Sequence, residues 1–160
     1  MGIVLFRVDE RLIHGQVTVG WGSRLKPHRY VVVDDMLADR DFEQDLYRLG
    51  VPDESEAEFC SVEDARVRLP SWLEEEARIV LLTRDLDHIR RLAAGGTLRG
   101  QRVNLGGIHY REGRTRVLPF LFLGNEERTQ IRALGEEGVE VSGQDLPGQP
   151  ETSSKILVDA

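Results

Sequence analysis

The sequence lacks the marks of secreted and membrane-spanning proteins. Cys60 is the only cysteine, so no disulfide can form within one chain and a reducing compartment is favoured. Its place in an apolar run predicts a small core residue rather than a nucleophile. No apolar stretch approaches the roughly 20 residues that span a bilayer, and no basic segment followed by an apolar one marks a signal peptide. These absences predict a cytoplasmic protein.

Common nucleotide and metal motifs are missing as well. The chain holds no complete dinucleotide fingerprint, no phosphate-binding loop of the NTPase type and no nucleophile elbow. Its histidines and its cysteine do not have metal-ligand spacing, so we predict neither a metal site nor a bound cofactor. With 21 basic and 28 acidic residues the net charge is −7, which argues against nucleic acid as a partner.

The chain does contain a regular alternation of apolar runs and helical patterns. Continuous apolar runs are typical of strands that are covered on both faces, as in a parallel sheet. We predict strands at residues 3–6, 30–33, 57–60, 79–82, 102–105, 120–123 and 139–141. Helical patterns lie between them, at residues 16–25, 39–49, 62–69, 72–76, 85–94 and 126–134.

This order predicts a single domain over residues 1–160 with an α/β fold, in which an open, mainly parallel, twisted sheet has helices on both faces. One segment interrupts the alternation. Residues 106–118 are polar and rich in glycine, and Glu112-Gly113 is typical of a tight turn, so we predict a β-hairpin excursion there. We expect residues 145–154 to form an irregular loop and residues 155–158 a last strand or turn.

The most informative residue is His14, which follows the first predicted strand and precedes a predicted helix. Loops at the carboxyl ends of parallel strands carry the chemistry of open α/β folds, and backbone amides at a helix start attract anions. A neutral imidazole beside cations and free amides is suited to accept a phosphoryl group. We therefore expect His14 to be the nucleophile. Arg11 would stabilise the phosphoryl charge as a bidentate donor, and Asp9 would orient the ring.

Other polar residues carry weaker signals. Asp34 and Asp35 follow the second predicted strand, where they could cap a helix or, near the site, bind an arginine of a partner or a metal ion. His109, in the glycine-rich excursion, is the one rival histidine for a site role and another candidate for a partner contact. His28 and His88 are expected to face solvent.

The loop around His14 is part of a longer motif. The sequence RVDERLIHGQV at residues 7–17 resembles, without a gap, the signature of the IIB component of the mannose/fructose/sorbose class of the bacterial phosphoenolpyruvate-dependent sugar phosphotransferase system. Two further stretches agree. The sequence VVVDD at residues 31–35 resembles the second strand of that family. The sequence VNLGG at residues 103–107, followed by REGRT at residues 111–115, resembles the family's glycine loop and hairpin.

The resemblance implies a single open α/β domain that carries phosphate. His14 would take the phosphoryl group from a phosphohistidine of the IIA component and pass it to a sugar held by the IIC and IID components of a membrane permease. The protein would then be peripherally associated with that permease, and a transient phosphohistidine would replace any cofactor. The phosphate-binding positions implied are Arg7, Gly15, Gln16, Asn104, Gly106 and Gly107.

Three points stay open at this stage. The chain could instead be a regulatory phosphorelay domain of the same family that takes no part in transport. It could also be an anion- or nucleotide-binding domain without a covalent step, a reading that rests on fold analogy. A homo-oligomer is possible as well.

Overall fold

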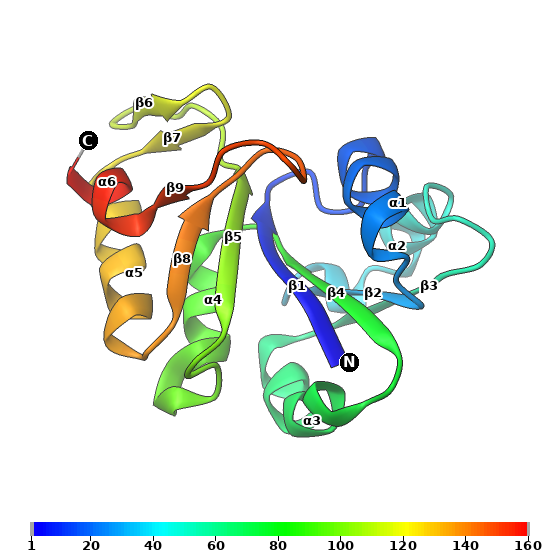
Figure 1. The fold of residues 1–160 in the computed structure, drawn as a ribbon. Coiled ribbons are helices and arrows are strands. Elements are labelled where there is room, and N and C mark those ends of the chain that lie inside the picture. Colours follow the sequence, from blue (N-terminus) through cyan, green and yellow to red (C-terminus); the bar gives the residue numbers. More distant parts are fainter. Residues whose placement is uncertain (1, 160) are drawn as a thin grey trace.

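The computed structural model describes residues 2–159, which form one seven-stranded sheet and a separate two-stranded hairpin (Figure 1). The strands of the sheet are β1 (Gly2–Asp9), β2 (Arg29–Val33), β3 (Glu56–Cys60), β4 (Arg78–Thr83), β5 (Arg102–Gly107), β8 (Glu140–Gly143) and β9 (Thr152–Ser153). Their order is β3-β2-β4-β1-β5-β8-β9, and every neighbouring pair is parallel except β8 with β9. The hairpin consists of β6 (Thr115–Leu118) and β7 (Leu121–Leu123).

Helices cover both faces of the sheet. The helical elements are the π-helical turn η1 (Gln16–Trp21), α1 (Gly22–Leu25), the 3₁₀ turn η2 (Leu37–Asp39), α2 (Asp41–Arg48), α3 (Val62–Glu74), α4 (Leu86–Ala93), the 3₁₀ turn η3 (Ala94–Gly96), α5 (Asn125–Glu136) and α6 (Ser154–Asp159). One buried core joins the sheet to α3, α4, α5 and α6, and a second joins it to η1, α1, η2 and α2.

Strand β2 shows why the apolar runs of this sequence are continuous. Val31 and Val33 lie in the first core, while Tyr30 and Val32 lie in the second, because successive side chains of a strand point to opposite faces. A strand with both faces buried needs no polar alternation. The prediction of an open, mainly parallel α/β sheet with helices on both faces is confirmed.

The sheet has a switch point beside its central strand β1. The chain leaves β1 toward β2 on one side, whereas it leaves the neighbouring strand β5 toward β8 on the other side. Ligand sites of open α/β sheets lie in the crevice that such a reversal opens at the carboxyl ends of the strands. Asp9 at the end of β1 pairs with Gly107 at the end of β5, so the loop that carries His14 starts at this crevice.

Helix α3 differs from the prediction, which ended it before Pro70 and began a second helical stretch at residue 72. The structure has one continuous helix through Pro70. A proline in a helix removes one backbone donor and clashes with the preceding turn. Leu69 and Trp72 are each only 1% exposed, and their burial against the sheet stabilises both halves of the same helix.

The hairpin excursion is present, but its strands lie later than the sequence indicated. Residues 112–113 do form a turn, yet the antiparallel pair is β6 with β7. The strand predicted at residues 120–123 is present as β7, but it belongs to this hairpin and not to the main sheet. The position of β7 is set by hydrogen bonds to the residue that directly follows β5. Ile108 donates to the Phe120 carbonyl at 3.1 Å and accepts from the Phe122 amide at 2.9 Å, which ties β7 to the excursion.

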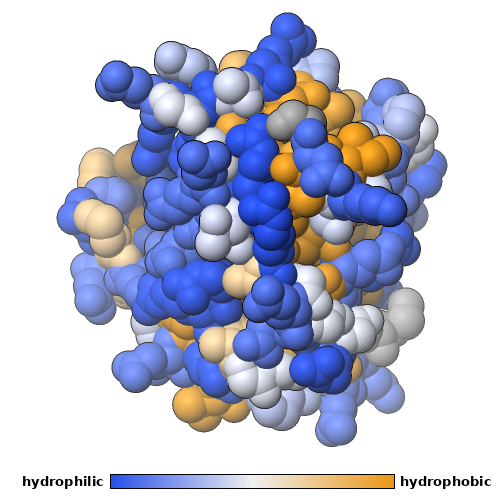
Figure 2. Space-filling view, turned by 90° about the vertical axis from the view of Figure 1, so that its left-hand side faces the viewer, coloured by the Kyte–Doolittle hydropathy of each residue, from blue (hydrophilic) through white to orange (hydrophobic). Residues whose placement is uncertain are grey.

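The C-terminal residues also depart from the prediction. Residues 155–158 belong to helix α6 and not to a strand, and Leu157 of this helix is fully buried in the first core. Residues 145–151 are irregular, as expected, whereas residues 152–153 form the short strand β9 and residue 154 begins α6. Figure 2 shows the side of the molecule formed by α5, α6 and the hairpin, which is mostly hydrophilic with a hydrophobic area in its upper right part.

Cys60 is buried at the end of β3, and burial raises the pKa of its thiol to about 12, so it is an unreactive core residue as expected. Within residues 2–159 no helix combines the length and the apolar composition needed to cross a bilayer.

Candidate functional site

His14 lies in a short loop between β1 and η1. The loop turns at Leu12, whose amide donates to the Asp9 carbonyl at 2.9 Å and whose φ of 55° is left-handed. Such a φ is uncommon for a residue other than glycine, and it is held here because the Leu12 side chain is fully buried. The carbonyl of His14 then accepts from the amides of Val17 and Thr18, both at 2.9 Å, which starts the helical turn.

Asp9 joins the two other residues predicted for the chemistry. Its Oδ2 lies 3.1 Å from Nε2 of His14 and 3.0 Å from Nη2 of Arg11, and its Oδ1 accepts from Nε of Arg11 at 3.0 Å. Asp9 is fully buried, whereas the His14 and Arg11 side chains are 18% and 38% exposed. The structure thus brings together all three residues, with the carboxylate behind and the imidazole and guanidinium toward solvent.

The environment of Asp9 keeps it ionised. Burial by itself raises the pKa of this carboxyl, but the hydrogen bonds from His14 and Arg11 outweigh burial and lower it to about 2. An ionised carboxylate only accepts hydrogen bonds, so Nε2 of His14 must carry the proton that faces it. Within residues 2–159, Nδ1 of His14 makes no hydrogen bond, which leaves that nitrogen as the open position of the ring.

This pKa predicts how stability depends on pH. A carboxyl whose pKa falls from 3.8 to about 2 on folding stabilises the folded state above pH 4 by about 2 kcal/mol, and this contribution is lost as the pH falls through 2. We therefore expect the difference in unfolding free energy between the wild type and Asp9→Asn to shrink by about 2 kcal/mol between pH 5 and pH 2. Urea titrations at several pH values would measure it, and a constant difference would contradict the assignment.

Arg7 lies behind Asp9 and is itself fully buried. Its Nη1 donates to the side-chain oxygen of Asn104 and to the Gln144 carbonyl at 2.9 Å, and its Nη2 donates to the Asp145 carbonyl at 2.9 Å. Nη2 also lies 3.6 Å from Oδ2 of Asp9. Burial lowers the pKa of the Arg7 guanidinium to about 10, which still leaves it charged at neutral pH. Arg7 therefore compensates the charge of Asp9 from the protein side.

The glycines at the end of β5 provide the space for this arrangement. A β-carbon on Gly106 would overlap the guanidinium of Arg7, and one on Gly107 would lie 2.7 Å from Oδ1 of Asp9. Both contacts are closer than real β-carbons show, so only glycine fits at these positions. Gly106, Gly107 and Asn104 thus support Arg7 and Asp9 from behind in this structure.

Two of the predicted phosphate-binding residues lie on the open side of the loop. Gly15 is exposed, and no heavy atom lies within 4 Å of a β-carbon built on it. Among the described residues, neither the Gly15 amide nor the Gln16 amide has a hydrogen-bond acceptor. The side-chain oxygen of Gln16 accepts from Nη2 of Arg11 at 2.6 Å. These groups surround the accessible part of the loop, where an anion could bind.

The residues predicted as partner contacts lie outside this group. Asp34 accepts from the amides of Met36 and Leu37 and pairs with Arg84 at 2.9 Å. Asp35 pairs with Arg91 at 2.7 Å. Both acids therefore have structural partners. His109 is 57% exposed, lies 2.9 Å from Glu10 and lines a groove of about 320 Å³ beside the loop. A contact with another protein stays a prediction for all three.

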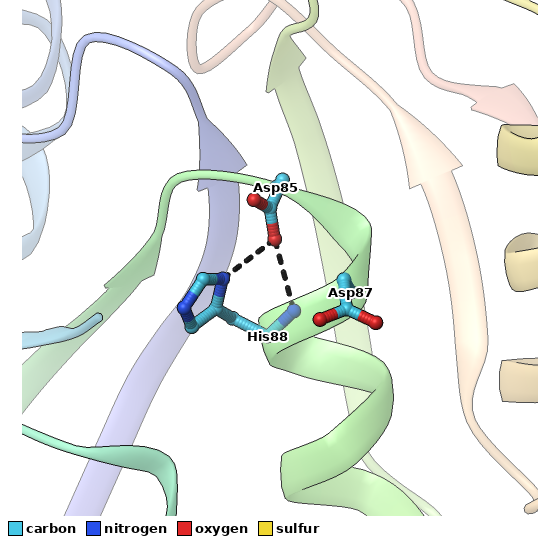
Figure 3. A group of neighbouring side chains, drawn as sticks. All are labelled: Asp85, Asp87 and His88. Carbon is cyan, nitrogen blue, oxygen red and sulfur yellow. Dashed lines mark hydrogen bonds and ion pairs between the residues drawn. The ribbon is translucent and has the colours of Figure 1, made fainter. Parts of the chain in front are cut away.

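His88 does not face solvent as predicted. Its side chain is 14% exposed, its Nδ1 lies 2.7 Å from Oδ1 of Asp85, and its Nε2 accepts from the Asp35 amide at 3.3 Å. The hydrogen bond with Asp85 raises the pKa of His88. Figure 3 shows Asp85 bound to His88 while Asp87 lies apart on the helix. These three residues are close enough to resemble a metal site, but Asp85 caps α4 and Asp87 pairs with Arg90 at 2.9 Å.

One further contributor to the site, the segment of residues 144–149, carries no recognisable motif. The Asp145 carbonyl accepts from Arg7 and, at 3.1 Å, from Nε1 of Trp21, and its Oδ1 accepts from Nε2 of Gln16 at 2.7 Å. Trp21 also stacks against Arg7, with 5.2 Å from the guanidinium carbon to the ring centre. An irregular, proline-containing stretch far along the chain has no pattern from which such docking could be predicted.

Comparison with known proteins identifies the family. Residues 3–159 match the family described as PTS system sorbose subfamily IIB component. The chain is 32% identical over 149 residues to the N-acetylgalactosamine-specific phosphotransferase enzyme IIB component 1 of Escherichia coli K12, covering 91% of this chain and 92% of that protein. It is 28% identical to the PTS system mannose-specific EIIAB component of the same strain, covering 99% of this chain and 49% of that longer protein.

A solved structure agrees with this assignment. The crystal structure of manxB from Thermoanaerobacter tengcongensis matches with a TM-score of 0.85 and 27% identity, over 98% of this chain and 95% of that one. Family match, relatives and fold thus point the same way as the geometry around His14. The chain belongs to the sorbose-subfamily IIB components of the phosphotransferase system and is a phosphoryl carrier in sugar transport.

Proposed function

We propose that this chain accepts a phosphoryl group on Nδ1 of His14 from a phosphohistidine of a IIA component and donates it to a sugar bound by membrane components of a permease. The observation that carries the proposal is the hydrogen bond between Nε2 of His14 and the ionised carboxylate of Asp9. It fixes the proton on Nε2 and leaves the lone pair of Nδ1 available for attack.

The first transfer needs no bound cofactor. The lone pair of Nδ1 attacks the phosphorus of the donor phosphohistidine, and the electron pair of the broken P–N bond returns to the donor ring. Asp9 stabilises the positive charge that develops on the His14 ring. In the second transfer a sugar hydroxyl attacks the phosphorus, its proton is released to solvent, and the P–N bond to His14 breaks.

Hydrogen-bond donors of the loop around His14 would stabilise the negative charge of the transferred phosphoryl group. Arg11 is partly exposed beside His14, and the free amides of Gly15 and Gln16 lie at the start of the helical turn. Fixed donors of this kind stabilise charge without reorganising during the reaction. The predicted roles of Arg11, Gly15 and Gln16 therefore remain part of the proposal.

The partners are proposed from the family and from one relative. The mannose relative carries IIA and IIB in one protein, as its name EIIAB states, which supports a IIA component as the donor here. The acceptor would be a sugar held by IIC and IID components, with this chain peripherally associated on the cytoplasmic side. The activity that the experiments below test is transfer of the phosphoryl group from the phosphohistidine of this chain to a sugar.

The test is incubation with phosphorylated IIA followed by mass spectrometry. We expect one phosphoryl group on His14 that is stable in base and labile in acid, because a P–N bond breaks when the ring is protonated. His14→Ala should take up none, whereas His28→Ala, which changes an exposed histidine directly before β2, at the amino-terminal end of the strands, should be phosphorylated like the wild type. Phosphate on the His14→Ala protein, or none on the wild type, would refute the proposal.

A second measurement separates transport from regulation. Phosphorylated protein is added to membranes that contain the IIC and IID components, and the label is followed onto sugars. Transfer to a sugar supports the proposed role. Stable phosphohistidine with no transfer to any sugar would favour a regulatory phosphorelay domain instead.

A further inference from the structure

Residues 144–149 form a segment that crosses the site and is fixed at several points; we call it the strap. Its first amide, on Gln144, donates to the Leu105 carbonyl at 3.1 Å, and the side chain of Gln144 donates to the Gln149 carbonyl at 2.9 Å. Leu146 packs over η1, where its methyl carbon lies 2.5 Å from the position a β-carbon on Gly20 would take. The strap is therefore a docked element in spite of its irregular backbone.

We propose that Asp145 of the strap is a positioning residue for phosphoryl transfer, which holds Gln16 so that Gln16 in turn holds Arg11 beside His14. This inference rests on the proposed function of His14. It adds a residue from the far end of the chain to the segment of residues 9–16, which we call the phosphorylation loop.

The chemistry of the three side chains fixes how they connect. The Asp145 carboxylate accepts from Nε2 of Gln16 at 2.7 Å, and Oε1 of Gln16 accepts from Nη2 of Arg11 at 2.6 Å. A carboxylate only accepts and a guanidinium only donates, so the amide between them fits in one orientation. Both bonds have a charged end and are short, as charge-assisted hydrogen bonds are. The chain of bonds thus orients Gln16 and Arg11 together.

Arg11 needs this support because it is partly exposed. Holding this long side chain in one geometry costs conformational entropy, which additional hydrogen bonds offset. Asp9 binds Nε and Nη2 of Arg11, and Gln16 supplies a second acceptor for Nη2 from the other side. Among the described residues, Nη1 of Arg11 makes no hydrogen bond, which leaves one fixed donor edge free for a phosphoryl oxygen.

The experiment compares two substitutions of Asp145, with phosphorylated IIA as the donor. Asp145→Ala removes the acceptor of Gln16, whereas Asp145→Asn keeps an oxygen acceptor, and both retain the backbone carbonyl that binds Arg7 and Trp21. We expect Asp145→Ala to slow phosphorylation of His14 by about tenfold or more. Asp145→Asn should stay within about threefold of the wild type. Equal slowing by the two variants would overturn the inference.

Two controls separate positioning from other effects. Asp53→Ala also removes one carboxylate, in an exposed loop before β3 at the other edge of the sheet, and should leave the rate unchanged. In a double-mutant cycle, Asp145→Ala combined with Gln16→Ala should be no slower than Gln16→Ala alone, because both act through the same chain of bonds. If the rate reductions caused by Asp145→Ala and Gln16→Ala multiplied in the double variant, Asp145 would have a merely structural role and the inference would be overturned.

A spectroscopic readout tests the inference without phosphate. In ¹⁵N spectra the Nη2–H signal of Arg11, the group that donates to Gln16, should exchange slowly with solvent in the wild type and in Asp145→Asn, and faster in Asp145→Ala. Slow exchange in Asp145→Ala would overturn the inference. If the signal behaved as expected but the wild type took no phosphate on His14, the proposed function would fail while the positioning of Arg11 by Asp145 would stand.

Discussion

Replacing Asp9 by asparagine is expected to slow phosphorylation of His14 by about 10²- to 10⁴-fold. The amide group of asparagine can donate a hydrogen bond to Nε2, which moves the ring proton to Nδ1, the nitrogen that has to attack. The amide also carries no negative charge to stabilise the ring as it becomes positive. The same change in a Ser-His-Asp triad costs about 10⁴-fold through the wrong tautomer. Rapid-quench measurement of a single turnover with phosphorylated IIA would give the rate.

The chain offers a matched control for this change. Asp85 lies 2.7 Å from His88 in a similar carboxylate–imidazole pair, but at the N-cap of α4 and outside the phosphorylation loop. Asp85→Asn should leave the rate at the wild-type value, and the helix should stay capped because asparagine is as good an N-cap as aspartate. Comparable slowing in Asp85→Asn and Asp9→Asn would contradict a specific role for Asp9.

Replacing Gly106 by alanine is expected to lower the free energy of unfolding by about 3 to 5 kcal/mol. The added methyl group would occupy the position of the Arg7 guanidinium. That guanidinium is fully buried and held by Asn104 and by the carbonyls of Gln144 and Asp145. It cannot move without leaving a buried charge unpaired, which is the main cost. Urea unfolding followed by circular dichroism would measure the loss.

Gly135→Ala is the control for the change of glycine to alanine itself. Gly135 is exposed in α5, with no heavy atom within 4 Å of a β-carbon built on it. Alanine there should raise the free energy of unfolding by about 0.5 to 1 kcal/mol, because it restricts the unfolded chain and favours the helix. A Gly106→Ala protein as stable as the wild type would show that Arg7 has room to move and that its burial does not depend on this glycine.

The part of the site that the sequence could predict lies within a few residues of His14. Asp9, Arg11 and Gln16 come from the same loop, and the structure brings all three around the histidine. The burial of Arg7 could not be predicted, because it depends on a glycine of another strand. Asp145 was missed for a similar reason, since it meets Gln16 from 129 residues away and no local pattern marks it.

The fold shows the same division between local and distant causes. The buried strands were predictable because burial on both faces leaves continuous apolar runs such as residues 79–82. Helix α3 continues through Pro70, and residues 155–158 become helix α6, because Trp72 and Leu157 are buried in the first core. Packing of distant elements overrides local preference in both places.

The bonds of Arg7 have a consequence for when the site can form. This residue near the N-terminus donates to carbonyls that lie 137 and 138 residues further along the chain. During synthesis the N-terminal loop therefore leaves the ribosome long before its supports exist, and contacts of such high sequence separation are slow to form. A partly synthesised or truncated chain would leave the Arg7 guanidinium without these two carbonyl acceptors. The phosphorylation loop is thus complete only in a chain whose last strands have docked, which couples its function to the completion of folding.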